Sequence, residues 1–528
     1  MNNKVKTILK NMGKTIDTDM LLKKTNSGKN ALSKTLNAYD LIILGISAII
    51  GSGIFVMIGP AVCGNHAHVG AGPATIISII LAAIACIFPA LCYAEFASMI
   101  PVAGSAYTYT YATMGEFAAW MMGWVLMLEY AIGNITIAVS WTEYLMQLLK
   151  GFPFLPHWLT NPPIWLVKDF TTAIAECKNA GIDPHSVIPY FCGIPVCMNL
   201  PALFIVLLIG FVLLQGTKES AKTAMIMVFI KLAVILLFVV VGAFYIKPEN
   251  WTPFMPFGFK GIILSAFIIF YAYIGFDAIS TAAEETENPQ KNLPIGLIGS
   301  LIVCSIIYAF VAVVFTGIIP VSDYGKVDIL APIAHVIRLI HQPWIAGWIA
   351  LGALAALTSV LLVFQYGTTR ILYAMTRDNF FPQSMKKIHP VHRTPHVITW
   401  VTTLTVMAGA LFTDANVAAE LCIFGTFASF ILVCLGILIL RKTEPDRPRP
   451  FKVPFCPWFP IAGILICLYL MVAVIEDLKT SALLFPLWLG IGVVIYFVYG
   501  YKQNRKAERG ELELVEEDEA AAEISDVF

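Results

Sequence analysis

The amino-acid sequence predicts an all-α polytopic membrane protein with twelve transmembrane helices. Of its 528 residues, 58% are apolar and only 13% are charged, which is far from the average of soluble proteins. Apolar runs recur along the chain at the length that crosses a bilayer, about 17 to 25 residues. Two of these runs are interrupted in the middle, at corresponding positions of the two halves of the chain, and such paired interruptions indicate a binding site at mid-membrane.

The expected spans follow one another along most of the chain. They cover residues 41–62, 73–100, 117–148, 201–216, 221–246, 261–285, 295–319, 345–376, 397–412, 416–440, 458–476 and 483–501. Only the polar stretch Thr413-Asp414-Ala415-Asn416 separates spans nine and ten. The alternative is one merged span, which would move the C-terminus to the other side of the membrane.

Lysine and arginine residues predict the orientation, because cytoplasmic loops carry an excess of them. Eight lysines precede Asp40, and the even-numbered loops add twelve cations against eight on the odd-numbered ones. Both tails, residues 1–39 and 502–528, are therefore expected in the cytoplasm of a cell whose plasma or inner membrane holds the protein. The basic residues are dispersed and not interleaved with aromatic ones, so no nucleic-acid partner is expected.

The outer loop of residues 150–200 is rich in proline and aromatic residues and has no run long enough to cross. It is interpreted as a cap, a spacer or the surface of an accessory partner. Cys177, Cys192 and Cys197 lie in it, so an external disulfide is plausible, but its pairing cannot be read from three cysteines. The acidic stretch from Glu511 to Asp526 is expected to be a solvated tail.

The two interrupted spans predict a site for a zwitterion. Around Gly51-Ser52-Gly53 the glycines permit close backbone approach, and the half-helix that follows offers free N–H groups and a positive dipole end that suit a carboxylate. The interruption that begins after Tyr271 leaves carbonyl groups of the outer half-helix for an ammonium group. An α-amino acid carries both charges on one carbon. The competing interpretation is that Gly51, Gly53 and Gly275 are only close-packing points between helices.

Four of the charged residues inside predicted spans stand out, because a charge costs at least a few kcal/mol at the bilayer centre. Lys231 is in the middle of span five and Glu129 is in span three. We interpret Lys231 as a built-in coupling cation beside the first interruption. The alternatives are a fixed ion pair, for instance with Glu129, or a lysine bonded to a carbonyl that never titrates. Glu95 is expected to be a helix-end carboxylate, and Asp277 the N-cap of the inner half-helix.

Several stretches in a fixed order resemble one known family over about residues 32–501. They are Gly51-Ser52-Gly53-Ile54-Phe55, Tyr93-Ala94-Glu95-Phe96, Pro101-Val102-Ala103-Gly104-Ser105-Ala106-Tyr107, Gly275-Phe276-Asp277-Ala278 with Glu284-Glu285-Thr286-Glu287-Asn288-Pro289, and Arg370-Ile371-Leu372-Tyr373-Ala374-Met375-Thr376-Arg377-Asp378. The chain resembles bacterial permeases of the cationic amino acid transporter type in the amino acid–polyamine–organocation superfamily.

The resemblance implies a leucine-transporter-like fold of two inverted five-helix repeats. The first would span residues 40–246 and the second 261–440, with two further helices in 458–501. It also implies alternating access and proton-coupled, sodium-independent import of amino acids. Neither a cofactor, a metal nor a catalytic residue is expected.

Carried over by position, the family pattern implies specific roles. The backbone near Ile49, Gly51, Ser52 and Gly53, with the Ser52 hydroxyl, would bind the substrate carboxylate. Carbonyl groups of Tyr271, Ala272 and Ile274 would bind the amine. Lys231, with Glu129, would carry the proton coupling, and its ammonium is expected near carbonyls around Gly51. Tyr271 would be the outer gate, with a hydroxyl that many relatives lack.

Selectivity is the least determined feature of the sequence. Thr358, Ser359 and Gln365 in span eight are the candidates for lining the side-chain pocket, and Glu129 is the only acidic one nearby. The family name favours arginine or lysine, but we expect a broad or neutral amino acid range. An exchanger, a polyamine carrier or a non-transporting sensor would share the fold. An intramembrane enzyme is the weakest alternative, because the chain has neither His-Glu-x-x-His nor Gly-x-Ser-x-Gly.

Overall fold

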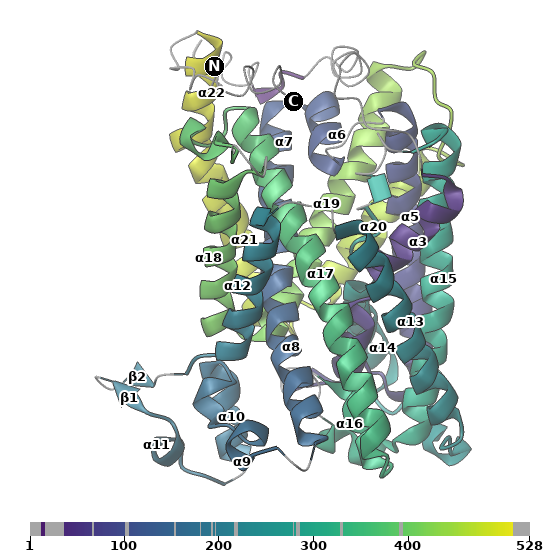
Figure 1. Ribbon diagram of the computed structural model, residues 1–528. Coiled ribbons are helices and arrows are strands. Elements are labelled where there is room, and N and C mark those ends of the chain that lie inside the picture. The colour runs from purple at the N-terminus through teal and green to yellow at the C-terminus, as the bar shows by residue number, and fades with distance from the viewer. Residues whose placement is uncertain are drawn as a thin grey trace.

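A computed structural model confirms the prediction of a helical, multi-pass membrane protein (Figure 1). The structure describes residues 12–15, 36–65, 68–100, 105–152, 155–179, 181–191, 194–195, 197–215, 220–277, 279–280, 286–327, 331–389 and 394–509. The predicted acidic tail, Cys192, the stretch Pro101-Val102-Ala103-Gly104 and most of the N-terminal tail lie outside these residues.

Within the described part of the chain, six helical stretches are long and apolar enough to cross a bilayer by length and composition. They are Gly72–Met99, Glu116–Lys150, Pro289–Ile318, Pro343–Arg377, Ala415–Thr443 and Lys479–Lys506. Their main helices are α5 (Thr75–Met99), α7 (Glu116–Met127) with α8 (Gly133–Lys150), α15 (Pro289–Ile318), α17 (Pro343–Arg377), α19 (Ala415–Thr443), and α21 (Lys479–Ile495) with α22 (Tyr501–Glu508). A seventh candidate is a bent pair, α3 (Ala38–Ile49) and the stretch Gly53–Cys63, which meet at 41°.

The remaining predicted spans coincide with shorter apolar helices. These are α12 (Leu200–Gln215), α13 (Ser220–Ala243), α14 (Gly258–Phe270), α18 (His396–Phe412) and α20 (Trp458–Ala473). Each of the twelve predicted apolar stretches therefore contains helix. The apolar parts of these five helices have only 10–17 residues, and the number twelve stays a prediction. Spans nine and ten are separate helices, because α18 ends at Phe412 and Asp414 caps α19 by accepting a bond from the Asn416 N–H at 2.7 Å.

The outer loop forms a small cap at one end of the bundle, opposite α22 (Figure 1). It contains α9 (His157–Thr160), α10 (Phe170–Asn179), α11 (Pro184–Val187) and a hairpin of β1 (Tyr190–Phe191) and β2 (Ile194–Pro195), so the fold is not helical throughout. Lys168 anchors the cap, since its ammonium lies 2.8 Å from Glu143 of α8 and 2.7 Å from Glu176 of α10. Cys177 and Cys197 are free thiols buried in one apolar cluster of this cap.

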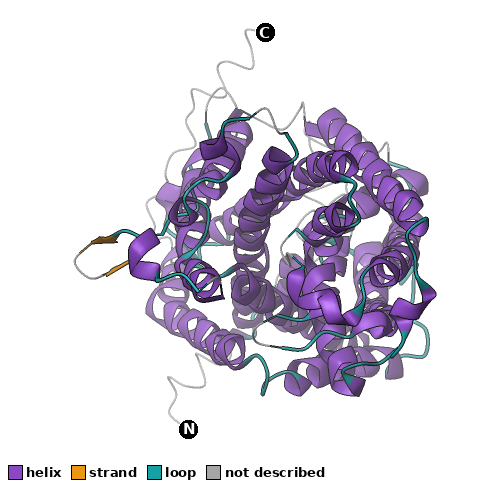
Figure 2. Ribbon diagram, turned by 90° about the horizontal axis from the view of Figure 1, so that it is seen from below, coloured by secondary structure: helices purple, strands orange, loops and turns teal. Residues whose placement is uncertain are grey.

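The long helices pack side by side into one bundle, which Figure 2 shows along its axis with the hairpin projecting at the edge. α15 contacts α3, α5 and α13, while α17 contacts α8 and α13. Ion pairs join helices far apart in sequence at the end opposite the cap. Glu95 of α5, predicted as a helix-end carboxylate, is fully buried and binds Arg441 of α19 at 2.6 Å, and Glu116 of α7 binds Arg505 of α22.

Two interruptions meet in the middle of the bundle. The first follows α3 and the second follows α14, whose last turn continues into the 3₁₀ segment η6 (Tyr271–Tyr273). A methyl group built on Gly53 would lie 2.1 Å from the Cα of Ala272, so the two backbones touch only because residue 53 has no side chain. Gly275 has φ of +106°, and a Cβ there would lie 2.9 Å from the Ala48 carbonyl oxygen.

We predict that Gly53→Ala destabilises the fold, because the added methyl group meets backbone rather than a movable side chain. Overpacking of this kind costs about 1–3 kcal/mol, which a fall in melting temperature in detergent would report. The matched control is Gly347→Ala in α17, where a Cβ meets nothing within 4 Å. Equal melting of the two variants would contradict the close approach of the two interruptions.

Candidate functional site: two interrupted helices at mid-bundle

The first interruption spans Ile50 to Ser52. α3 ends at Ile49, Ile50 is extended with φ of −75° and ψ of 103°, and a π-helical turn η1 (Gly53–Met57) follows before α4 (Ile58–Cys63). Phe55 is the first following residue whose N–H bonds back, to the Gly51 carbonyl at 3.4 Å. Among the bonds of the described residues outside regular helices, none is donated by the N–H groups of Gly51, Ser52 or Gly53. This interruption therefore presents backbone donors.

The second interruption presents carbonyl groups. After η6, Ile274 is extended with φ of −61° and ψ of 139°, and its N–H donates to the Tyr271 carbonyl at 3.3 Å. Tyr271, Ala272 and Ile274, predicted to hold the amine, are all buried beside the first interruption. Since η1 and η6 are in direct contact, backbone donors of one interruption lie next to backbone acceptors of the other.

Tyr308 of α15 joins the two interruptions. Its hydroxyl is shared between the Ile49 carbonyl at 3.1 Å and the Ala272 carbonyl at 2.8 Å. In a similar way, the Tyr144 hydroxyl of α8 donates to the Phe55 carbonyl. Side chains of neighbouring helices thus supply partners that the interrupted helices cannot supply themselves, as hydrocarbon surroundings require.

Lys231 of α13 is fully buried and donates from its ammonium to the Ser47 carbonyl of α3. Ser47 lies one turn before the first interruption, near the position expected for a coupling cation. No ion pair of Lys231 is found among the described residues, so the interpretation as a fixed pair with Glu129 gains no support. The bond to a carbonyl group of the interrupted helix fits both the interpretation as a coupling cation and the interpretation as a carbonyl-bonded lysine that never titrates.

Glu129 lies in a second π-helical turn, η3 (Leu128–Ile132), and is 1% exposed. One carboxylate oxygen accepts from the Ser429 hydroxyl at 3.5 Å, and the other has no hydrogen-bond partner among the described residues. Asp277, which follows the second interruption, interacts electrostatically with Glu129 and accepts from the Tyr130 hydroxyl at 2.9 Å. Two buried acidic side chains are therefore neighbours. The half-helix that Asp277 is predicted to cap includes residues 278 and 281–285, which lie outside the described part.

Tyr271 lies where the two interruptions and α8 converge. Its hydroxyl donates to the Gly133 carbonyl at 3.3 Å and interacts with the hydroxyls of Ser52 and Thr136. The residue predicted as the outer gate and the hydroxyl predicted to help bind the carboxylate are thus neighbours. The phenol hydroxyl ties Tyr271 to α8.

The span-eight candidates for the side-chain pocket already have partners. The Thr358 hydroxyl accepts from the Trp141 indole at 3.0 Å, and the Ser359 hydroxyl donates to the Ala356 carbonyl at 2.7 Å. Gln365 is buried and bonds Asn134 at 2.9 Å and Thr402 at 3.0 Å. The α17 side chain that lies against the first interruption is instead Val360, whose Cγ2 would be 2.2 Å from a Cβ on Gly51.

Sequence reasoning missed Tyr308, Val360, Tyr144 and Asn134. Asn134 is fully buried with its carbonyl oxygen unpartnered among the described residues, one residue from the Tyr271 contact. A polar residue inside an apolar span is a usable signal for Asn134, Tyr144 and Tyr308. Val360 leaves no such signal, because it is an ordinary core residue in an apolar run.

The fold and the paired interruptions define a membrane permease, and comparison with known proteins identifies its family. The model of the "Amino acid permease" family matches residues 36–497, so the chain belongs to this family of transporters, which are not enzymes. The chain is 43% identical to the branched-chain amino acid permease BcaP of Bacillus subtilis, over 91% of this chain and 96% of the relative. It is 40% identical to a methylthioribose transporter of the same species, over 90% and 96%, respectively.

More distant relatives confirm the resemblance noted from the motifs. The chain is 32% identical to the chloroplastic cationic amino acid transporter 9 of Arabidopsis thaliana, over 90% of this chain and 79% of the relative. The names of these three relatives cover apolar, sugar-like and cationic cargo. Membership in the family therefore does not by itself decide the substrate.

We predict that Tyr308→Phe weakens both the fold and the binding of substrate, because two carbonyl groups at the interruptions lose their shared donor. Leaving buried acceptors unpaired costs about 1–3 kcal/mol, which should lower the melting temperature in detergent and the thermal shift caused by substrate. Tyr469→Phe is the control, since Tyr469 is a 59% exposed tyrosine of α20. Identical shifts in both variants would contradict this role of Tyr308.

Proposed function

We propose that this permease imports α-amino acids by alternating access, and that it binds them between its two helix interruptions. The adjacency of open N–H groups at residues 51–53 to carbonyl groups at residues 271–274 is the observation that carries this proposal. A zwitterion is the small solute that satisfies both backbone poles at once. A solute with only one charge leaves one pole without a partner.

In this proposal each pole has a role. The N–H groups of Gly51, Ser52 and Gly53, together with the backbone at Ile49 and the Ser52 hydroxyl, bind the carboxylate. Carbonyl groups of Tyr271, Ala272 and Ile274 receive the amine, and the Tyr308 hydroxyl holds the Ile49 and Ala272 carbonyl groups in position beside them. Tyr271 then separates the occupied site from the outside, anchored through its hydroxyl on α8.

Proton coupling is the second part of the proposal. Lys231 provides a positive charge that is part of the chain, so import needs no sodium at that position. Because the side-chain amine of Lys231 bonds to the Ser47 carbonyl, protonation of this amine shifts the preferred position of α3 relative to α13. Glu129 and Asp277 support the same function, because two carboxylates in apolar surroundings cannot both be ionised at low cost, and a proton between them is favoured.

For the substrate we propose a neutral amino acid with an apolar side chain. Val360 lies against Gly51, and Phe364 packs edge-on against Tyr130 with ring centroids 5.2 Å apart. The similarity to a branched-chain amino acid permease supports the same choice. The unpartnered oxygen atoms of Asn134 and Glu129 would suit a cationic or hydroxylated cargo, which is the competing assignment.

The arrangement in the membrane is also proposed. The chain has twelve spans in two inverted five-helix repeats and two further helices, and its basic end faces the cytoplasm of the cell membrane, with both tails. The cap of residues 150–200 then lies outside. Its anchoring by Lys168 on α8 suits a structural cap as well as the surface for an accessory partner.

An amino acid exchanger is the second candidate. It is favoured by one observation, the bond of Lys231 to a carbonyl group rather than to a carboxylate. A lysine held in this way can keep its proton throughout the cycle, and no net proton movement then occurs. A polyamine carrier or a sensor without transport would require a different occupant or no passage at all.

Uptake into proteoliposomes tests the function directly. We expect labelled leucine to accumulate when the interior is alkaline, in the absence of sodium, with unlabelled valine and isoleucine competing better than arginine or methylthioribose. Strong stimulation by internal leucine with little net uptake would identify an exchanger. Saturable binding without any flux would identify a sensor, and better competition by arginine would overturn the neutral substrate.

We predict that Lys231→Met abolishes uptake driven by the pH gradient, because the built-in cation is lost. Exchange of internal for external substrate should continue, which shows that the variant is folded. Lys247→Met, at an exposed lysine after α13, is the control and should leave uptake unchanged. Full accumulation by the Lys231 variant would reject the coupling role.

A further inference from the structure

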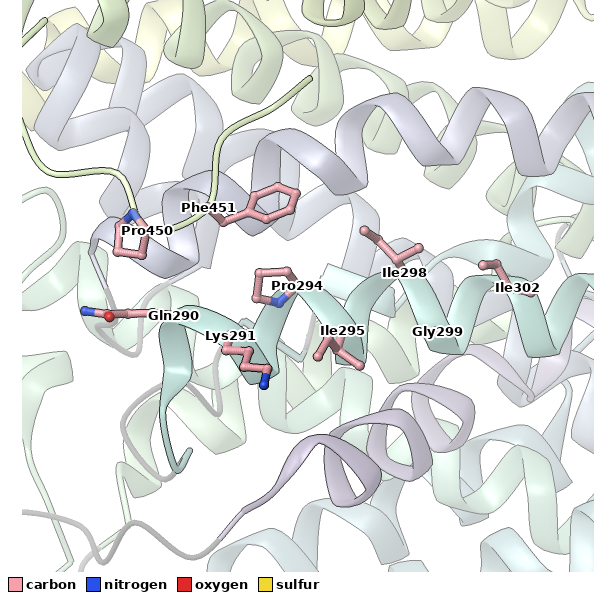
Figure 3. Close-up of a pocket in the computed structure, with 9 residues that line it drawn as sticks. All are labelled: Gln290, Lys291, Pro294, Ile295, Ile298, Gly299, Ile302, Pro450 and Phe451. Atoms are coloured by element: carbon pink, nitrogen blue, oxygen red, sulfur yellow. The ribbon is translucent and has the colours of Figure 1, made fainter. Parts of the chain in front are cut away.

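Two features of the molecule lie outside the transport site. One is a groove of about 520 Å³ along the start of α15, with Ile295 and Ile298 on one side and Pro450 and Phe451 on the other (Figure 3). Lys291 is the only charged residue among the described residues that line it, and most of the lining is apolar. The groove therefore identifies no ligand of its own. The other feature is a pair of buried thiols in the outer cap.

Cys177 and Cys197 lie in one small apolar cluster of the cap. With Ala173 and Ile188 they are its buried members, and their exposed fractions are 3% for Cys177 and 4% for Cys197. The two thiols also interact electrostatically with each other. They are not bonded in the structure, so the arrangement is that of the reduced cap. The fold has thus brought together two cysteines that α11 and the hairpin separate along the chain.

Hydrogen bonds fix the backbone beside both cysteines. The Cys177 carbonyl accepts from the Ile182 N–H at 2.9 Å. On the other side, the N–H of Met198, which follows Cys197, donates to the Trp165 carbonyl at 2.7 Å. The chain between these two anchored points carries α11 and the hairpin, which projects at the edge of the molecule in Figure 2. The two cysteines therefore mark the base of the projecting part of the cap.

The surroundings of Cys197 do not suit a reactive thiol. Burial raises the pKa of this thiol, and the neighbouring Asp169 carboxylate and Cys177 thiol raise it further. A thiol with a raised pKa is a weak nucleophile and a weak metal ligand, because both roles need the thiolate. Among the described residues, no group of three or more potential ligands could hold a metal ion. The chemistry that remains for this pair is a bond with each other.

The cap has little apolar core to hold its projecting part. The buried members of its cluster are four residues, two of which are the cysteines themselves. Small units on the outer side of a membrane bury too little apolar surface to be stable alone, and disulfides commonly stabilise them. A bond between residues 177 and 197 would close the segment that carries α11 and the hairpin. It would thereby restrict the unfolded states of that segment.

We propose that Cys177 and Cys197 form a disulfide that closes the base of the cap. From the proposed function this inference takes only the orientation in which the cap lies outside, because disulfides persist in that compartment. The bond would tie α10 to the stretch that leads into α12. Cys192, the third cysteine of the cap, lies outside the described residues and has no part in the proposal.

The oxidant is a disulfide-bearing molecule of the outer compartment, either a protein or a small molecule. One cysteine thiolate attacks a sulfur of this disulfide, which forms a mixed disulfide and releases one thiol. The thiolate of the second cysteine then attacks the protein sulfur of the mixed disulfide and releases the other thiol. The two cysteines lose two electrons and two protons, and both pass to the two thiols released. Because a raised pKa slows such an attack, the bond should form before the cap closes around the thiols.

Lys178 provides a test that needs no transport measurement. It is exposed, and it is the only lysine or arginine between the two cysteines. Intact cells that express the full chain are treated with N-ethylmaleimide to block free thiols and then with trypsin. The fragments are analysed by mass spectrometry under denaturing conditions. We expect the fragment that ends at Lys178 to stay attached to the one that begins at Asn179, and to separate from it completely after reduction.

Variants identify which cysteines form the bond. Cys192→Ser is the matched control and should keep the two fragments attached, whereas Cys177→Ser and Cys197→Ser should each separate them without reductant. Lys178→Gln should remove this cleavage. The wild type alone decides the main result, so a cysteine variant that fails to fold leaves the test intact.

Separation of the wild-type fragments without reductant would overturn the proposal, and so would separation in Cys192→Ser. Cleavage at Lys178 only after the membrane is dissolved in detergent would overturn the orientation on which the proposal depends. None of these outcomes bears on the substrate or on the coupling role of Lys231, since uptake is not measured. A failure here is therefore distinct from a failure of the transport function.

Discussion

Hydrocarbon does not solvate peptide groups, and this constraint governs the middle of the molecule. An interrupted helix in a membrane survives only where other protein groups, or a wet cavity, replace the lost backbone bonds. Here Tyr308, Tyr144 and Lys231 donate to carbonyl groups at Ile49, Ala272, Phe55 and Ser47, and each donor comes from a helix other than the interrupted ones. The interruptions therefore exist because of the bundle around them. The N–H groups at residues 51–53 donate no hydrogen bond outside regular helices among the described residues. Under the proposed function, a solute is their partner.

Much of this arrangement was predictable from the order of residues, and the reasons are local. Apolar runs of sufficient length predicted where each helix lies, and glycines within two of them predicted the interruptions. Lys231 was found because a charge in an apolar run is costly. Tyr308 was missed because its partner Ile49 is 259 residues away, and a sequence pattern does not say which neighbour a helix face will meet. Glu95 is a similar case, because its partner Arg441 is 346 residues away and turns an expected helix-end carboxylate into a buried ion pair.

The π-helical turns are the part of the site for which the sequence carried no signal. One follows the first interruption at Gly53–Met57, and another contains Glu129 at Leu128–Ile132. Each π-helical turn adds one residue to the helix, so the side chains that follow are rotated relative to those of a regular helix. Turns of this kind are frequent at functional sites. The thiol of Cys422 donates to the Glu129 carbonyl at 3.1 Å. This backbone carbonyl inside the π-helical turn thereby has a side-chain partner. The direction of the Glu129 carboxylate thus depends on backbone geometry that propensities do not describe.

Under the proposed mechanism, α3 is the element through which proton and substrate influence one another. Its last turn accepts from Lys231 at Ser47, its end at Ile49 accepts from Tyr308, and the N–H groups just beyond it receive the carboxylate. A carboxylate that draws the interruption into its bound geometry also fixes the position of the Ser47 carbonyl relative to α13. Linkage then requires that protonation of Lys231 changes the affinity for substrate by the same factor by which bound substrate changes the affinity of Lys231 for the proton. The positive charge of Lys231 on α13 therefore influences substrate binding through the last turn of α3, and no ion needs to move between the two sites.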